Sequence, residues 1–161
     1  ITLDVYGDGR LRGRLQRLVK RLGMSDRVRL HGPVANARVP QILADHDIFA
    51  LASRTAANGD REGIPITLLE AQAAQRPVLT TRHAGIPEAV PAAHHAYLAE
   101  EAAPADLAGK LRLLIARRGD WAAIGARGRS WVEQRFSRCA EVAAYRSLFA
   151  GLNGPSSSGD A

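Results

Sequence analysis

Several residue types that whole classes of protein depend on are scarce in this chain of 161 residues. The single cysteine, Cys139, cannot form a disulfide within the chain, which excludes a disulfide-stapled fold and favours a reducing compartment. No apolar run approaches the roughly eighteen residues that a membrane-spanning helix needs. Aromatic residues make up only 5%, so the net charge of +6 comes without base-stacking side chains and does not indicate a nucleic-acid partner. The histidines at 83, 94 and 95 do not have a recognised metal-ligand spacing.

The overall composition is that of an ordinary globular protein, and arginine supplies most of its positive charge. Hydrophobic residues reach 46% and charged residues 24%, and the length suits one domain with one core. Four arginines recur at helical spacing: Arg10, Arg14, Arg17 and Arg21. We interpret them as a solvated helix face. The alternative is peripheral contact with an anionic membrane surface.

Short apolar strands alternate with helical patterns along most of the chain, which indicates an α/β fold with a Rossmann-like parallel sheet and helices on both faces. We expect strands at about 1–6, 27–31, 47–52, 77–81 and 96–98. We expect helices over about 11–22, 39–46, 65–74, 104–117, 120–134 and 139–151. This domain would span 1–152, and the Ser/Gly-rich segment 153–161 is expected to be disordered.

The most informative stretch is the run from Gly59 to Ala74. A polar loop there turns into an apolar helix, with Pro65 suited to the first helical position. The helix is apolar almost all round, so we expect it to be buried, with Glu70 inside and in need of a partner. Glu62 lies eight positions earlier, and the helix N–H groups between the two carboxylates favour an anion. The segment predicts two acceptors for ligand hydroxyls and a seat for a diphosphate.

This run resembles the retaining GT-B glycosyltransferases of the group 1 family, which are family 4-like. The shared pattern is Glu-x7-Glu with Gly-Ile-Pro after the first glutamate. Arg76–Thr81 and Ala84–Glu88 are similar to the branch that builds bacterial exopolysaccharide, including colanic-acid-type enzymes. The resemblance implies the C-terminal, donor-binding half of a GT-B fold.

The resemblance also implies roles for individual residues. Glu62 would be the catalytic-site residue that meets the donor sugar's hydroxyls, and Glu70 would accept the ribose hydroxyls. The backbone of Gly63, Ile64, Pro65 and Ile66 would hold phosphate and sugar. The backbone at Gly32 and the side chain of Val34 would contact the nucleobase. The helix dipole and basic side chains would meet the phosphate charge, so we expect no metal and no cofactor besides the nucleotide diphosphate sugar itself.

The implied reaction is transfer of a hexose from a nucleotide diphosphate sugar to a polysaccharide or lipid-linked acceptor. In the resembled family this half begins one strand and helix earlier and follows an acceptor-binding domain. We therefore expect the chain to be the C-terminal part of a longer bacterial enzyme and to be inactive alone. We also expect it to be cytoplasmic, at the inner face of the membrane if the arginine face touches lipid.

Two other classes of function compete with this interpretation. One is a non-catalytic module that binds a sugar nucleotide. The other is a dinucleotide-dependent oxidoreductase, which Gly7-Asp8-Gly9 suggests, although Arg12 stands where the third glycine of that fingerprint belongs. Finally, Arg82 and His83 follow a predicted strand, so we expect them to line the ligand cleft.

Overall fold

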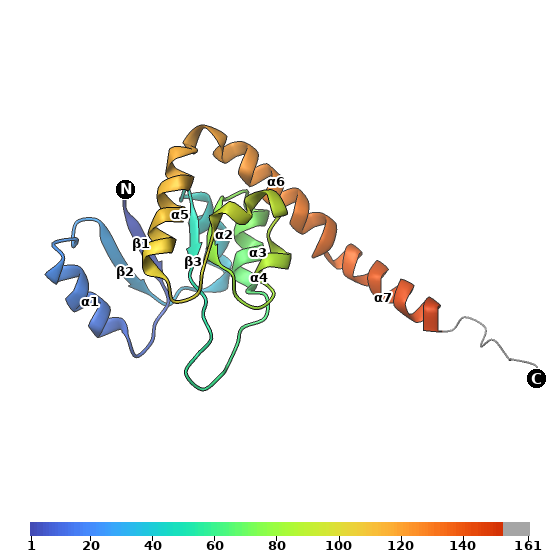
Figure 1. The fold of residues 1–161 in the computed structure, drawn as a ribbon, viewed down its shortest axis with the longest axis horizontal. Helices are drawn as coiled ribbons and strands as arrows, with labels where there is room; N and C mark the ends of the chain where they lie inside the picture. The colour runs from blue at the N-terminus through green and yellow to red at the C-terminus, as the bar shows by residue number, and fades with distance from the viewer. Residues whose placement is uncertain (153–161) are drawn as a thin grey trace, which may run out of the picture. The chain divides into compact units, whose positions relative to one another are not determined.

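The computed structural model describes residues 1–152, and the predicted disordered tail lies outside the described residues. The chain divides into two compact units, Ile1–Ile42 and Leu43–Ala161. Each unit contains a parallel sheet with helices (Figure 1), so the predicted α/β class is confirmed. The strands predicted to share one sheet belong to two separately hydrogen-bonded sheets.

The first unit contains a two-stranded parallel sheet. Strand β1 (Leu3–Tyr6) pairs with β2 (Val28–Gly32), and helix α1 (Arg12–Arg21) connects them. Gly23 follows the helix at φ +65°, the left-handed conformation expected of a glycine stop. No residue of α1 is buried in this structure, and Leu15 within it is 40% exposed.

The second unit is built on a three-stranded parallel sheet in the order β3-β4-β5. These strands are β3 (Phe49–Leu51), β4 (Val78–Thr81) and β5 (Leu98–Ala99). Every residue of the central strand β4 is buried, as a parallel strand with both faces covered requires. The register places the carboxyl ends of the three strands at one edge of the sheet, because Leu51 pairs with Thr80 and Thr81 pairs with Ala99. The residues that follow the three strands are therefore brought together.

Helices cover this sheet, and in Figure 1 β3 is drawn between α3 and α5. The helices after α1 are α2 (Val39–Ala44), α3 (Ile66–Ala73), α4 (Ile86–Ala89), α5 (Pro104–Ala116), α6 (Trp121–Arg135) and α7 (Arg138–Leu152). Short 3-10 turns occupy Asn36–Arg38, Ala92–Tyr97 and Arg118–Asp120. The core of the sheet–helix packing is formed by Leu79, Tyr97 and Leu114, with Leu107, Leu111, Trp121 and Ile124 against them.

The sequence pattern predicted neither a helix nor a strand between 81 and 96, but Ile86–Ala89 form the short helix α4. Four residues are too few to show a helical period in the sequence, which is why the pattern missed it. None of the helices within residues 1–152 has the length and apolar character needed to cross a bilayer.

Candidate functional site

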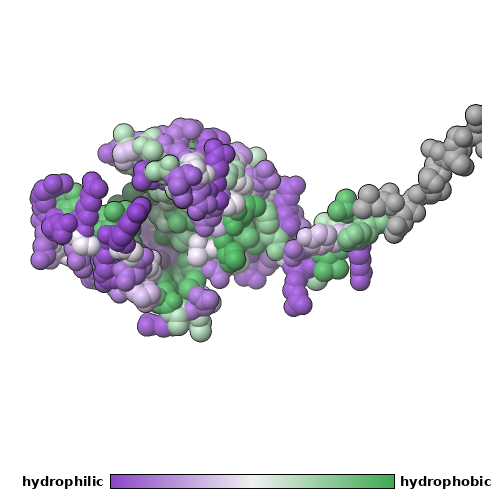
Figure 2. All heavy atoms as spheres, turned by 90° about the horizontal axis from the view of Figure 1, so that it is seen from below, coloured by the Kyte–Doolittle hydropathy of each residue, from purple (hydrophilic) through white to green (hydrophobic). Residues whose placement is uncertain are grey.

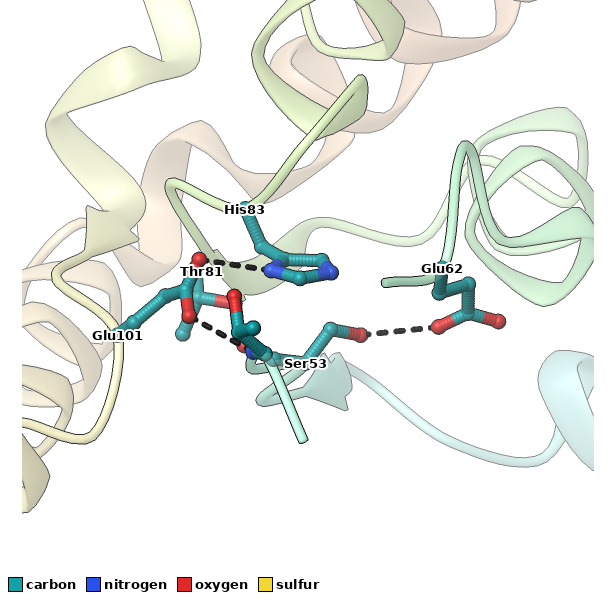
Figure 3. A network of polar contacts seen from close by, with 6 residues as sticks. Ser53, Glu62, Thr81, His83 and Glu101 are labelled. Atoms are coloured by element: carbon teal, nitrogen blue, oxygen red, sulfur yellow. Dashed lines mark hydrogen bonds and ion pairs between the residues drawn. The ribbon is translucent and has the colours of Figure 1, made fainter. Parts of the chain in front are cut away.

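The candidate site lies where the three strands of the second unit end. Thr81, the last residue of β4, donates its hydroxyl to the Ser53 carbonyl at 2.6 Å. The Thr55 N–H donates to Glu101 Oε2 at 2.8 Å. Ser53 and Thr55 follow β3, and Glu101 follows β5, so the two bonds tie the three strand ends together (Figure 3).

His83 lies at this edge of the sheet, but its ring is buried and does not line an open cleft. Its ring is 0% exposed, and its Nδ1 lies 2.7 Å from Glu101 Oε1. The backbone bond from Thr55 and the contact with His83 lower the pKa of Glu101, so its carboxylate is ionised and accepts both bonds. The other ring nitrogen, Nε2, is buried and has no partner among the described residues.

The backbone beside this pair is strained. Ala84, next to His83, has φ 43°, and Ala102, next to Glu101, has φ 53°. A side chain with a Cβ rarely adopts such angles, and each instance costs on the order of 1–2 kcal/mol. Strained residues of this kind are concentrated at ligand sites, where the surrounding structure holds them.

Glu62 is held at the same edge of the sheet. Its Oε2 accepts a hydrogen bond from the Ser53 hydroxyl at 3.2 Å, and Thr81 fixes the Ser53 carbonyl. The glutamate itself remains exposed. Its carboxylate is therefore oriented by one hydrogen bond and open to a ligand.

The loop after Glu62 leads into helix α3. Pro65 is the N-cap residue of this helix, whereas the sequence predicted it at the first helical position. A Cβ on Gly85 would lie 2.7 Å from Ile64 Cγ1, so the two loops touch and a side chain at position 85 would force Ile64 to move. A Cβ on Gly63 would meet nothing within 4 Å. The first N–H groups of α3 have no intrahelical partner, so this end of the helix suits an anion.

The expectation that Glu70 is buried is wrong. Helix α3 buries one face, formed by Leu68, Ala71 and Gln72, whereas Ile66 is 74% exposed and Glu70 is exposed on that opposite face. Glu70 therefore needs no buried partner. The buried polar residue of the helix is Gln72, whose amide donates to the Ala89 carbonyl at 2.9 Å.

The two predicted base-contacting residues belong to the first unit. Gly32 is buried at φ +91°, and its carbonyl accepts from the Gly7 N–H at 2.7 Å. Arg12 donates to the Leu30 carbonyl at 3.1 Å, and a Cβ on Gly32 would lie 2.8 Å from its guanidinium. The Arg12 side chain therefore lies against the end of β2, and it is the positive φ of Gly32 that disfavours any other residue at that position. Val34 is half-buried just beyond.

Sequence reasoning missed four polar residues of this edge: Ser53, Thr55, Thr81 and Glu101. Each is at or just after the end of a predicted strand, and that position was the available signal. Arg82, predicted beside His83, is exposed and pairs with Glu100 at 3.3 Å. Among residues 1–152, no three or more His, Cys, Asp or Glu side chains come together in a way that could hold a metal ion.

Comparison with known proteins identifies the family. The sequence profile described as "Glycosyl transferases group 1" matches residues 1–117. The amylovoran biosynthesis glycosyltransferase AmsK of Erwinia amylovora is 35% identical over 147 residues, which are 91% of this chain and 35% of that protein. A protein of Escherichia coli K12 named as a colanic acid biosynthesis glycosyltransferase is 40% identical over 97 residues, 60% of this chain and 24% of its own length. The predicted resemblance to exopolysaccharide enzymes is thereby confirmed.

The fold is also shared with solved structures. Anabaena HepE in complex with UDP-glucose superposes with a TM-score of 0.74 and 25% identity, covering 96% of this chain and 41% of that one. The chain spans about a third or less of the length of the two relatives from Erwinia amylovora and Escherichia coli. Its fold is that of the GT-B glycosyltransferases, and the chain belongs to the group 1 glycosyltransferase family.

Proposed function

We propose that this chain is the donor-binding half of a retaining glycosyltransferase, which transfers a hexose from a nucleotide diphosphate sugar to a polysaccharide or lipid-linked acceptor. The observation that carries the proposal is the position of Glu62, fixed by Ser53 at the carboxyl edge of the parallel sheet and next to the start of α3. Ligands of α/β sheets bind at this edge. The UDP-glucose complex of the Anabaena protein supports the class of donor, and the amylovoran and colanic acid relatives support a polysaccharide acceptor.

The diphosphate is placed at the N-terminus of α3. The free N–H groups of Ile66 and Thr67 and the positive end of the helix dipole would hold its oxygens. The open space over Gly63 lets the ligand approach the backbone. Backbone donors aimed at a leaving diphosphate stabilise the charge that develops on it, so the proposal includes no metal and no further cofactor.

The two glutamates have separate tasks in this proposal. Glu70 accepts hydrogen bonds from the ribose hydroxyls on the exposed face of α3, and Glu62 accepts from hydroxyls of the donor sugar. As the bond between the anomeric carbon and the diphosphate oxygen breaks, the acceptor oxygen attacks the same face of the sugar. The leaving diphosphate takes the acceptor's proton, so the step needs no protein nucleophile.

The remaining predictions belong to the same proposal. The Gly32 backbone and the Val34 side chain contact the nucleobase. The arginines at 10, 14, 17 and 21 are all exposed. Exposed cations suit contact with the anionic lipids of a membrane. We therefore propose that the enzyme is cytoplasmic and lies at the inner face of the membrane.

Titration of the chain with UDP and with GDP by isothermal calorimetry tests the proposal. We expect binding of one of the two, and Glu70→Gln should weaken it by 1.5–3 kcal/mol, about 10- to 150-fold, through loss of a charge-assisted acceptor. Glu62→Gln should leave the nucleotide affinity nearly unchanged and lower only the added affinity of the matching sugar nucleotide. Glu141→Gln, an exposed change on α7, is the control.

The outcomes separate the alternatives. If neither nucleotide binds, the donor-site assignment is wrong. If Glu62→Gln weakens nucleotide binding and Glu70→Gln does not, the two roles are reversed. Binding without turnover, measured in a protein that also carries the acceptor half, would favour the non-catalytic module.

A further inference from the structure

His83 is a side chain of the sheet edge that is fully buried yet only half satisfied. Thr80 Oγ1 on β4 and Gln72 Oε1 on α3 are also buried without a partner among the described residues. Its Nδ1 contacts Glu101, whose second carboxylate oxygen is already taken by the Thr55 backbone. Its Nε2 is shielded from solvent and has no hydrogen-bond partner within the described part of the chain. In Figure 3 this nitrogen points away from Glu101, toward the side on which Glu62 lies. A buried polar atom without a partner is uncommon and calls for a specific explanation.

The contact with Glu101 decides what Nε2 can do. An ionised carboxylate only accepts hydrogen bonds, so Nδ1 must carry the proton that it shares with Glu101. In the neutral ring the proton on Nδ1 makes Nε2 an acceptor. An acceptor at this place suits a hydroxyl group and would repel a phosphate oxygen.

We propose that His83 is a further donor-binding residue, whose Nε2 accepts a hydrogen bond from a hydroxyl of the donor sugar while Glu101 holds the ring in place. The inference rests on the proposed function, and it assigns to the sugar a contact distinct from those of Glu62 and of the α3 N-terminus. It makes Glu101 a positioning residue, since Glu101 acts through the ring and not on the ligand.

The surroundings of the ring are consistent with a ligand site. The ring is fully covered, so a hydroxyl reaches Nε2 only if part of the chain that covers the ring shifts. The segment 52–65 between β3 and α3 contains neither helix nor strand and carries Glu62. The strained residues Ala84 and Ala102 adjoin His83 and Glu101. Backbone strain is maintained where the local geometry serves a function.

The test uses variants that separate the two ring nitrogens. His83→Asn keeps a nitrogen near the position of Nδ1, and so the contact with Glu101, but removes Nε2. His83→Gln does the reverse, because its amide reaches the position of Nε2. Each variant is titrated with UDP and UDP-glucose and with GDP and GDP-mannose, and its melting temperature is compared with that of the unaltered chain.

For His83→Asn we expect a near-normal melting temperature, unchanged affinity for the nucleoside diphosphate within twofold, and about three- to tenfold weaker binding of the sugar nucleotide. His83→Gln should regain part of the sugar-dependent affinity. A merely structural role would move the melting temperature and leave the difference between nucleotide and sugar nucleotide intact.

Other results overturn the assignment in distinct ways. Equal loss for nucleotide and sugar nucleotide would mean a phosphate contact, and no loss for either would mean that Nε2 meets only water. In both cases the proposed function stands, whereas failure of the unaltered chain to bind any of the four probes removes the proposed function as well.

Should the variants unfold, the unaltered chain gives the answer through its ¹⁵N histidine spectrum. Saturation with the sugar nucleotide should shift one buried Nε2 signal that the nucleoside diphosphate leaves in place. An unchanged spectrum would contradict the proposal.

Discussion

At the scale of single residues, Gln75 has a backbone conformation that glycine adopts more readily. It follows α3 at φ 58°, and the chain closes the helix there with two bonds, from the Gln75 N–H to the Gln72 carbonyl and from the Arg76 N–H to the Ala71 carbonyl. This is the Schellman arrangement, whose left-handed position is usually a glycine.

We predict that Gln75→Gly stabilises the chain by about 1 kcal/mol, because glycine adopts φ > 0 without the steric cost that a Cβ imposes. The melting temperature should rise by about 2–4 °C for a domain of this size. Gln75→Ala is the control and should give no such gain, since alanine keeps the Cβ. A lower melting temperature for the glycine variant would show that the Gln75 side chain contributes packing worth more than the strain.

The sequence predicted the structural position of a residue when that position depends on its neighbours along the chain. Glu62 and Pro65 lie close to their expected places because a loop-to-helix transition is local. The environment of Glu70 was not predictable, because a helix of mixed apolar residues does not reveal which face its neighbours cover. The contact between His83 and Glu101 joins residues 18 positions apart through two loops, and no sequence period encodes it.

At the scale of elements, α6 approaches the end of α3 through two glycines. A Cβ on Gly125 would lie 2.1 Å from the Gln75 carbonyl oxygen, closer than any real contact. A Cβ on Gly128 would lie 3.4 Å from the Gln72 side chain, an ordinary contact distance. The two positions are three residues apart on one helix face, but only one of them requires a glycine.

We therefore expect opposite effects from the same substitution. Gly125→Ala forces the two backbones apart and should cost about 2–3 kcal/mol or more. Gly128→Ala should be neutral or stabilise by up to about 1 kcal/mol, because alanine is the better helix former. Urea denaturation of both variants measures the difference. Similar destabilisation by the two alanines would mean that α6 and α3 do not pack as described.

The elements themselves were largely predictable, because each buried strand is a short apolar run and each long helix has a recurring apolar pattern. Their ends differ from expectation by a few residues at most. Helix α4 and the 3-10 turn Ala92–Tyr97 escaped prediction, since short turns have no period. In the sequence, the glycines of α6 indicate only weak helix formation. The structure shows that they lie on the helix face that packs against α3.

At the scale of the whole molecule, the sequence predicted parallel strands but not which of them pair. The alternation of strand and helix implies parallel pairing, because crossover connections return the chain in the same direction. Pairing partners depend on contacts between distant segments, so the division into a two-stranded and a three-stranded sheet required the structure.

The pH dependence of folding is another property of the whole molecule, and it centres on a histidine outside the candidate site. His94 is 4% exposed and packs beside the Tyr97 ring. Burial is the main cause that lowers the pKa of His94 to about 4 from 6.5, and the nearby charges of Arg127 and His95 lower it further. Glu101 has a lowered pKa as well, through its bonds to Thr55 and His83.

Both shifts make acid destabilising, in different ranges. Between pH 6.5 and about 4 the unfolded chain binds a proton at His94 that the folded chain does not, so the free energy of unfolding falls as the pH is lowered through this range. The Glu101 contribution is present above its ordinary pKa of 4.5 and is lost only as the pH falls below that value. Between pH 6.5 and about 4.5, the change in the free energy of unfolding therefore comes mainly from His94.

We predict that the chain loses on the order of 1–3 kcal/mol of stability between pH 7 and pH 4.5 through His94, since each pKa unit of difference corresponds to about 1.4 kcal/mol. Denaturant unfolding at half-unit steps of pH measures this slope. His94→Gln cannot take up a proton, so its stability should be nearly independent of pH across the window, even if its absolute stability is lower. Glu141→Gln, at an exposed position on α7, serves as the control and should keep the slope. A slope that persists in His94→Gln would assign the acid sensitivity to other groups and contradict the burial of a neutral His94.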